Sequence, residues 1–346
     1  MPHDHPLHVA VNGAGAFGRN HLRVYRELRQ AGIPVELAAI VDPDPALTAA
    51  LREEWQAPVY ASVAECIAAL RAHQLHLDAA SICVPTSLHY DVAAELLNHG
   101  LDLLIEKPIA TSVAEADALV ALARQQNRIL QIGHLERFNP AITAIQPHLN
   151  HPLFFEAHRL SIFSPRALDV DVVLDLMIHD LDIVLSIAQS PVRHLHAVGL
   201  PILSGKVDIA NVRIEFESGC VANFTASRVS TERVRKLRFF QPHQYVSIDY
   251  ARRDLLVIDV SGVPAATAAH AVSLSPLPAG VSIAKPPVAP GEPLRLEIEA
   301  FLHAVRTRAT PLVSGVDGRA ALALALQVNQ AIADHAQRAG LDKFHL

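Results

Sequence analysis

Asp175 and His179 are four residues apart, a spacing that places both side chains on one face of a helix. An imidazole whose pKa is near its ordinary value of about 6.5 can accept a proton at neutral pH, and a neighbouring carboxylate can orient the ring. Leu174 and Ile178 supply an apolar stripe on the same helix. The pattern predicts a helix over residues 172–188 that packs with one side and carries acid–base chemistry on another. The alternative is an exposed Asp/His pair without a reactive role.

A glycine-rich turn lies near the N-terminus, between the apolar run HVAVN and a helical pattern. Gly13 permits a tight turn, Gly15 lets the backbone approach a pyrophosphate, and Gly18 lets the following helix pack on the strand. The amino end of that helix attracts phosphates. The spacing predicts a dinucleotide-binding loop made of Gly13, Ala14, Gly15, Ala16, Phe17 and Gly18. The alternative is a glycine turn used for packing alone.

A carboxylate, Asp42, ends the second apolar run, VELAAIV. It follows Gly18 by roughly 20 residues, the separation expected for the acid that hydrogen-bonds the adenosine ribose hydroxyls. Because a carboxylate at that place repels a 2′-phosphate, we expect the cofactor to be NAD rather than NADP. The alternative role for Asp42 is that of a loop cap.

Two more apolar runs, residues 79–84 and 101–106, end in segments that carry polar side chains. The carboxyl ends of parallel strands are where open α/β sheets bind ligands. We therefore expect cofactor contacts from residues at or just after these ends, which are Pro85, Thr86, His89, Glu106 and Lys107. For Lys107 the alternative is a solvated lysine that simply follows a strand.

Short apolar runs alternate with helical patterns in the first part of the chain, which is typical of a parallel sheet with right-handed helical crossovers. Ser112 and Glu115 form a capping-box pattern at the start of one helix. Farther on, one helical segment precedes a series of β-like runs. We predict an α/β Rossmann domain at residues 1–133 and an α+β domain with a large, mostly antiparallel open sheet at residues 134–346. Closely spaced prolines predict a surface excursion over residues 263–293.

Composition limits the classes of partner. A formal net charge of −6 lacks the basic surface that nucleic acid requires, which favours a small-molecule substrate. The three cysteines have no CxxC spacing and the 20 histidines are scattered without an HExxH pair, so neither a disulfide framework nor a metal site is predicted. No apolar run approaches the roughly 18 residues of a membrane span, and no export signal is visible. We expect a cytoplasmic protein without a membrane partner.

The order of these motifs resembles the Gfo/Idh/MocA family of oxidoreductases over nearly the whole chain, and the EKP sequence that contains Lys107 is its most specific mark. The resemblance implies that Lys107 contacts both nicotinamide and substrate and that its peptide bond to proline is cis. It also implies that a DxxxH pair, here Asp175 and His179, completes the catalytic set. The family often has a glycine cluster before this pair, whereas this chain has Asp169 and Asp171.

Two later stretches offer polar side chains to a substrate. The sequence GHLERFNP can hydrogen-bond sugar hydroxyls, although a hinge between the domains is the alternative. Arginines just upstream of the DxxxH helix suit a diphosphate through charge-assisted hydrogen bonds. The predicted substrate contacts are Lys107, Glu136, Arg137, Asn139, Arg159, Ser164, Arg166 and His179.

The motifs after residue 133 are most similar to the branch of the family that oxidises the 3-hydroxyl of UDP-N-acetylglucosamine to the 3-keto sugar for amino-sugar lipid A synthesis. This resemblance implies an NAD-dependent dehydrogenase that acts on a secondary hydroxyl. Two alternatives stay open: a dehydrogenase of a free sugar, polyol or UDP-sugar acid, and an NAD-binding regulator without turnover. The resemblance also implies a homodimer or homotetramer formed through the sheet of the second domain.

Overall fold

The computed structural model describes residues 5–163, 170–260 and 280–341. The chain divides into two units, of which the first is Met1–Leu135 with Glu292–Leu322 and the second is Glu136–Gly291 with Ala323–Leu346. Residues 292–322 therefore group with the first unit, which differs from the predicted division at residue 133. The reason is a late amphipathic helix whose apolar side chains enter the core of the first unit.

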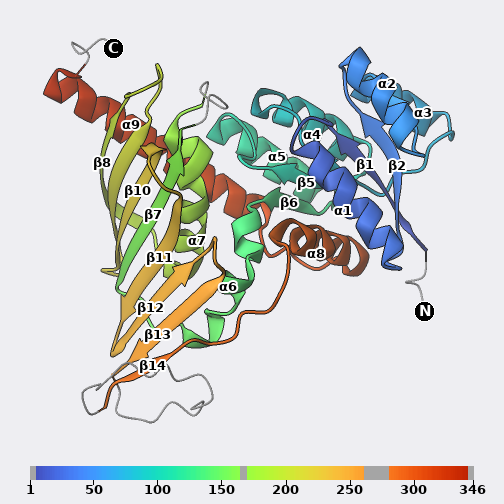
Figure 1. Ribbon diagram of the computed structural model, residues 1–346. Coiled ribbons are helices and arrows are strands. Elements are labelled where there is room, and N and C mark those ends of the chain that lie inside the picture. The colour runs from blue at the N-terminus through green and yellow to red at the C-terminus, as the bar shows by residue number, and fades with distance from the viewer. Residues whose placement is uncertain (1–4, 164–169, 261–279, 342–346) are drawn as a thin grey trace. The chain divides into compact units, whose positions relative to one another are not determined.

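Six parallel strands form the sheet of the first unit, in the order β3-β2-β1-β4-β5-β6 (Figure 1). The strand order reverses beside β1, and the crevice at such a reversal is where open α/β sheets bind dinucleotides. This arrangement confirms the predicted Rossmann fold. The strands are β1 (Leu7–Asn12), β2 (Val35–Val41), β3 (Val59–Tyr60), β4 (Ala79–Ile82), β5 (Asp102–Glu106) and β6 (Leu130–Gly133).

Helices connect and cover these strands, as the alternating pattern predicts. The Ser112 hydroxyl accepts a hydrogen bond from the Glu115 N–H, and the Glu115 carboxylate accepts one from the Ser112 N–H, which confirms the capping box. The helix that joins this unit from late in the chain, α8, buries Ile298 and Phe301 in the same core as Tyr25 of α1. The helices are α1 (Gly18–Gln30), α2 (Pro45–Glu54), α3 (Val63–Arg71), α4 (His89–Asn98), α5 (Val113–Gln125) and α8 (Pro293–Thr307), with a 3-10 turn at Thr86–Leu88.

Eight strands form the sheet of the second unit, in the order β14-β13-β12-β11-β7-β10-β9-β8. Every neighbouring pair is antiparallel except β7 and β10, which confirms a large, mostly antiparallel sheet. The strands are β7 (Phe154–Ile162), β8 (Val192–Leu200), β9 (Ile209–Phe216), β10 (Val221–Ser230), β11 (Val234–Gln241), β12 (Gln244–Asp249), β13 (Asp254–Asp259) and β14 (Ser282–Ala284).

Strand β7 lies near the middle of this sheet but was not among the predicted strands. Its buried face carries Phe155, Ala157 and Arg159. A charged residue at a buried position breaks the apolar/polar alternation by which a half-buried strand is recognised. The core of this sheet therefore includes a cation that must be neutralised within the protein.

The predicted helix over residues 172–188 is present, but its first turn is π-helical. The π turn covers Val173–Met177 and continues as α7 (Ile178–Ala188). Asp171 caps this start, because its Oδ1 accepts from the N–H groups of Val173 and Leu174 at 2.9 Å each. The other helical segments are α6 (Pro140–Thr143), α9 (Gly315–Ala339), which crosses from the first unit to the second after Leu322, and 3-10 turns at Leu135–Phe138 and Gln146–His148.

No helix among the described residues combines the length and apolarity needed to cross a membrane. Within the predicted surface stretch, residues 263–279 lie outside the described ranges. The remainder of that proline-rich stretch contributes the short edge strand β14. An edge is where strand prolines are tolerated, because one side of the backbone needs no ladder partner.

Candidate functional site

The glycine loop joins β1 to α1 and is built from backbone. Gly13 has a φ of 87°, and a Cβ there would lie 2.7 Å from the Cys83 carbonyl. A Cβ at Gly18 would lie 1.8 Å from the Gly13 oxygen, so that this turn can close only around glycine. By contrast, a Cβ at Gly15 would meet nothing within 4 Å. Gly15, Ala16 and Phe17 form the exposed tip of the loop, and no side chain caps the amino end of α1. The loop therefore fits a phosphate group held by backbone N–H groups.

Asp42 lies at the end of β2 and is bonded to this loop. Its Oδ2 accepts from the Ala14 N–H at 2.7 Å, and its Oδ1 accepts from the Asp44 N–H at 3.0 Å. The carboxylate therefore acts as a loop cap, which was one of the two predicted roles. Each carboxylate oxygen has a second lone pair, so these bonds leave capacity for a ribose hydroxyl.

Glu106 ends β5 directly before Lys107, and its side chain is held inside the first unit. Its Oε1 lies 2.9 Å from Nε2 of His21, and both side chains are buried. A Cβ at Gly133 would lie 2.8 Å from the same oxygen, so this glycine makes room for the carboxylate. The predicted cofactor contact of Glu106 stays a prediction, whereas the bond to His21 is a contact that the sequence did not signal.

His89 links the two loops that follow β4 and β5. Its Nδ1 lies 2.8 Å from the Pro108 carbonyl oxygen, and its Nε2 lies 2.9 Å from the Val84 carbonyl oxygen. Burial lowers the pKa of this imidazole, so the neutral ring donates to only one carbonyl at a time. The predicted cofactor contact of His89 stays a prediction; in the structure its Nδ1 faces the backbone beside Lys107, and its Nε2 faces the loop after β4. The Lys107–Pro108 bond is cis, as the resemblance implies.

The remaining predicted cofactor residues, Pro85 and Thr86, lie in the loop that follows β4, with Pro85 exposed and Thr86 half-buried. Lys107 follows β5 and is also half-buried. The first unit thus presents the glycine loop and residues after three strands, β2, β4 and β5, at the carboxyl edge of one parallel sheet. That edge is the binding edge of open α/β sheets.

In the second unit, Asp175 lies within the π turn and His179 lies in the first turn of α7. Both side chains are half-buried. Residues four apart remain near one face in either helix type, because four residues advance about 400° in an α-helix and somewhat less than 360° in a wider π-helix. Single π turns inserted in helices occur often at functional sites. The π turn is thus a second feature, besides the spacing of Asp175 and His179, that is typical of a functional site.

Three of the predicted substrate residues form a buried ionic network in the second unit. The Arg159 guanidinium donates to both carboxylate oxygens of Asp180, at 2.8 and 2.9 Å, and to Oε1 of Glu136 at 3.1 Å. Glu136 Oε2 in turn accepts from Nδ2 of Asn139 at 3.0 Å. The Arg159 side chain is 3% exposed and lies over the ring of Tyr250.

This network gives Glu136, Asn139 and Arg159 a structural role, and their contact with substrate stays a prediction. Their polar groups are directed to one another and to Asp180, the residue that follows His179, so they anchor the start of α7 from β7 and from the segment after β6. The division between the two units falls between Leu135 and Glu136, which agrees with the alternative that GHLERFNP connects the domains.

Other predicted substrate residues have different environments. Arg137 NH1 lies 3.4 Å from the Asp182 carboxylate, and the arginine side chain is 12% exposed. Ser164 and Arg166 lie outside the described residues. Two basic residues of β11 contact carboxylates on neighbouring strands: Arg238 lies 3.8 Å from Glu156 of β7, and Lys236 lies 3.9 Å from Asp249 of β12. Arg235 lies 3.8 Å from Glu136, a member of the buried network.

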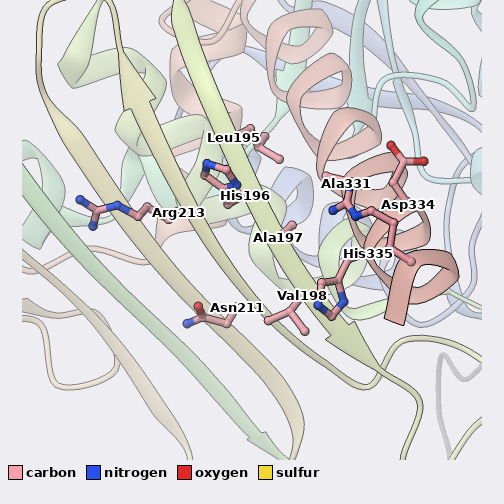
Figure 2. Close-up of a pocket in the computed structure, with 10 residues that line it drawn as sticks. Leu195, His196, Ala197, Val198, Asn211, Arg213, Ala331, Asp334 and His335 are labelled. Atoms are coloured by element: carbon pink, nitrogen blue, oxygen red, sulfur yellow. The ribbon is translucent and has the colours of Figure 1, made fainter. Parts of the chain in front are cut away.

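A hollow of about 490 Å³ lies between β8, β9 and α9 in the second unit (Figure 2). None of the predicted site residues lines it. Figure 2 shows that its walls come from three elements, and the lining residues are Leu195, His196, Ala197, Val198, Asn211, Arg213, Ala331, Asp334, His335 and Arg338. We therefore do not assign the dehydrogenase chemistry to this hollow.

Comparison with known proteins places both units in one family. Residues 7–134 match the oxidoreductase family with an NAD-binding Rossmann fold, and residues 142–241 match the GFO/IDH/MocA C-terminal domain. The chain is 34% identical to UDP-N-acetylglucosamine 3-dehydrogenase from Acidithiobacillus ferrooxidans over 96% of this chain and 99% of that protein. It is 26% identical to inositol 2-dehydrogenase from Rhizobium meliloti over 94% of this chain and 96% of that protein.

Solved structures agree with these sequence matches. A structure of the Acidithiobacillus ferrooxidans UDP-N-acetylglucosamine 3-dehydrogenase has a TM-score of 0.84 at 34% identity, over 94% of this chain and 97% of that one. Levoglucosan dehydrogenase in complex with NADH, at 17% identity and a TM-score of 0.80 over 95% of this chain and 97% of that one, shares the fold. Both family matches and the 34% identity over nearly the whole chain show that the chain belongs to the GFO/IDH/MocA family of NAD-binding oxidoreductases.

Proposed function

We propose that this protein oxidises the 3-hydroxyl of UDP-N-acetylglucosamine to the 3-keto sugar, with NAD⁺ as the hydride acceptor. The observation that carries this proposal is the 34% identity, over 96% of the chain, to a dehydrogenase named for that reaction. The match extends through both units, so it covers the glycine loop, Lys107 and the Asp175/His179 pair.

In the proposed reaction His179 is the general base. Oxidation of the secondary alcohol removes a hydride from carbon and a proton from oxygen, and the imidazole accepts that proton. NAD⁺ held at the glycine loop would supply the hydride acceptor. Asp175, one helical turn away, orients the ring. Lys107 stabilises the negative charge that develops on the substrate oxygen and fixes the position of the alcohol.

The chain's own groups support the binding of NAD⁺ by the first unit. The open space at Gly15 and the uncapped amino end of α1 suit the pyrophosphate. Asp42 keeps lone pairs for the adenosine ribose hydroxyls, and its negative charge disfavours a 2′-phosphate. His89 and Glu106 hold the backbone on either side of Lys107.

The wider setting of this activity is part of the same proposal. A 3-keto sugar is a substrate for an aminotransferase, so the product suits the synthesis of amino-sugar lipid A in the cytoplasm. Arg137 lies next to the buried ionic network in the sequence but is not part of it. Its side chain is partly exposed, so it remains a candidate substrate contact. Self-association through the sheet of the second unit, as a homodimer or homotetramer, belongs to this proposal as well.

The test measures NADH formation at 340 nm with NAD⁺ and UDP-N-acetylglucosamine, the corresponding UDP-sugar acid, free sugars and inositols in parallel reactions. A ketone trap or an aminotransferase is included to remove the product. Turnover with UDP-N-acetylglucosamine alone is the expected result. Turnover only with a free sugar, a polyol or the sugar acid would reassign the substrate, and tight NAD⁺ binding without turnover of any compound would favour the regulator.

A further inference from the structure

Two imidazoles and a carboxylate lie close together at the amino ends of β1 and β4. None of these three side chains has a role in the proposed dehydrogenase reaction. His8 lies on β1, while His76 and Asp78 lie in the segment just before β4. Each residue offers one ligand atom, and these atoms all lie within 4.8 Å of one another. The three residues come from chain positions that only the folded sheet brings together.

The spacing of these atoms is that of ligands around one small ion. Nδ1 of His8 lies 3.5 Å from Asp78 Oδ2, and Nε2 of His76 lies 3.2 Å from Asp78 Oδ1. Zinc binds imidazole nitrogen and carboxylate oxygen at about 2.0–2.2 Å, which puts neighbouring ligands of a tetrahedral ion roughly 3.3–3.6 Å apart. The set therefore needs only small side-chain adjustments to close around a metal.

The backbone holds two of these ligands in place without any ion. The His8 N–H donates to Asp78 Oδ2 at 2.8 Å, and the Asp78 N–H donates to the His8 carbonyl at 2.9 Å. The parallel pairing of β1 with β4 continues from this point. The Nδ1 atom of His8 is buried and makes no hydrogen bond within the described part of the chain. A buried nitrogen in that state is available as a metal ligand, and the backbone hydrogen bond from His8 fixes the position of the Asp78 carboxylate beside it.

The three residues border a hollow that a further imidazole also lines. The hollow has a volume of about 460 Å³, and the further imidazole is that of His5. Arg306 also lines this hollow, but its guanidinium donates to a backbone carbonyl, that of Pro34. Imidazole nitrogens with one carboxylate are typical of zinc and related transition metals, whereas magnesium and calcium prefer oxygen ligands.

We propose that His8, His76 and Asp78 form a binding site for a divalent transition-metal ion, with Zn²⁺ as the representative ion. The site lies at the amino ends of the strands, whereas the glycine loop and Lys107 follow carboxyl ends of the same sheet. A metal there ties the N-terminal segment to the sheet and acts on stability, apart from the hydride-transfer chemistry. The sequence-based expectation of no metal site rested on local motifs, which this set does not contain.

The experiment uses the full-length chain without a polyhistidine tag, treated with a chelator and then dialysed. Zn²⁺ binding is measured by titration calorimetry, and the melting temperature is measured with and without Zn²⁺, with Mg²⁺ as the comparison ion. We expect Zn²⁺ to raise the melting temperature and Mg²⁺ to leave it unchanged. His76→Asn, at a side chain that is 70% exposed, should weaken Zn²⁺ binding at least tenfold and remove the shift, without changing the melting temperature in chelator.

His73→Asn is the matched control, because His73 is an exposed histidine three residues earlier, and asparagine tolerates its φ of 56°. It should bind Zn²⁺ as the parent does. Asp78→Asn is a second test that keeps an oxygen acceptor for the His8 N–H while removing the charge. The proposal would be overturned if His76→Asn and Asp78→Asn both kept the Zn²⁺ affinity and the melting-temperature shift of the parent. It would also be overturned if Zn²⁺ did not shift the melting temperature of the parent.

Discussion

The two units carry their candidate site residues in different ways. In the first unit the glycine loop is shaped by backbone contacts, such as the close approach of Gly18 to the Gly13 carbonyl. In the second unit the helix that carries Asp175 and His179 is anchored by side chains, through the ion pair of Arg159 with Asp180. Geometry set by glycine is tolerant of the surrounding side chains, whereas geometry set by buried charges fails when one partner is lost.

This difference separates what each unit contributes to the proposed reaction. A backbone-built loop recognises the phosphates common to every NAD molecule, and it requires few specific side chains. A helix held by buried ions can place a general base accurately, since the charged partners allow few alternative arrangements. Substitutions in the two units should therefore fail in distinguishable ways, by loss of cofactor affinity in one and by loss of turnover or stability in the other.

The largest expected effect is that of His179→Ala on turnover. Removal of the general base should lower kcat with UDP-N-acetylglucosamine by about 10²- to 10⁴-fold, while the dissociation constant of NADH, measured by fluorescence titration, stays within about twofold. His194→Ala, at an exposed histidine of the same unit, is the control and should be neutral. Equal losses of turnover and NADH affinity in His179→Ala would show that the two units do not divide the work as we propose.

Arg159→Met tests the anchoring of the second unit. The substitution leaves the buried Asp180 carboxylate without its cation and leaves Glu136 with only the longer contact to Arg235, so the free energy of unfolding in urea should fall by about 3–5 kcal/mol. Arg238→Met is the matched control on a neighbouring strand, because Arg238 lies 3.8 Å from Glu156 and both side chains are about a third exposed. It should cost about 0–1 kcal/mol. Similar losses from both variants would contradict the special role of the buried network.

Two glycine substitutions sharpen the description of the first unit. Gly18→Ala places a Cβ against the Gly13 carbonyl and should lower the free energy of unfolding by about 1–3 kcal/mol. Gly15→Ala enters open space, so its melting temperature should equal that of the parent while its NAD⁺ affinity falls, because the added methyl group occupies the approach of the pyrophosphate. An NAD⁺ affinity that is unchanged in Gly15→Ala would remove the loop from the cofactor site.

The last expected effect is on the pH dependence of stability. Glu297 of α8 is fully buried, and burial together with the nearby Glu106 carboxylate raises the pKa of Glu297 well above its ordinary value. The folded state therefore binds this proton more tightly than the unfolded state does. Stability from this group is complete below the ordinary carboxyl pKa of about 4.3 and is lost as the pH rises, by up to about 1.4 kcal/mol per pH unit.

Glu297→Gln removes the titration. The variant should gain stability relative to the parent as the pH is raised from 5 to 8, as measured by urea unfolding at each pH. Glu299→Gln, at a surface position of the same helix with an ion pair to Arg295, should follow the pH dependence of the parent. A parent and Glu297→Gln variant with parallel pH profiles would mean that Glu297 does not carry the pH dependence.

Much of the first unit could be predicted because its signals are local. Each strand and helix there is a short segment with its own periodicity, and the glycines, the capping box and Asp42 act within or between adjacent elements. The Asp175/His179 pair could also be predicted, since both residues lie within one helical segment. Local sequence determines such features because backbone sterics and side-chain periodicity act over a few residues.

The tertiary structure decided what depends on residues far apart in the chain. It assigned α8 to the first unit, placed Arg159 between Glu136 and Asp180, and paired His21 with Glu106. It also assembled the His8, His76 and Asp78 cluster from two strand ends. No sequence spacing predicts these contacts, because the distance between two side chains on different elements is fixed by how the elements pack. The sequence by itself therefore determined most of the elements and the glycine loop, while packing determined which charged side chains pair inside the protein.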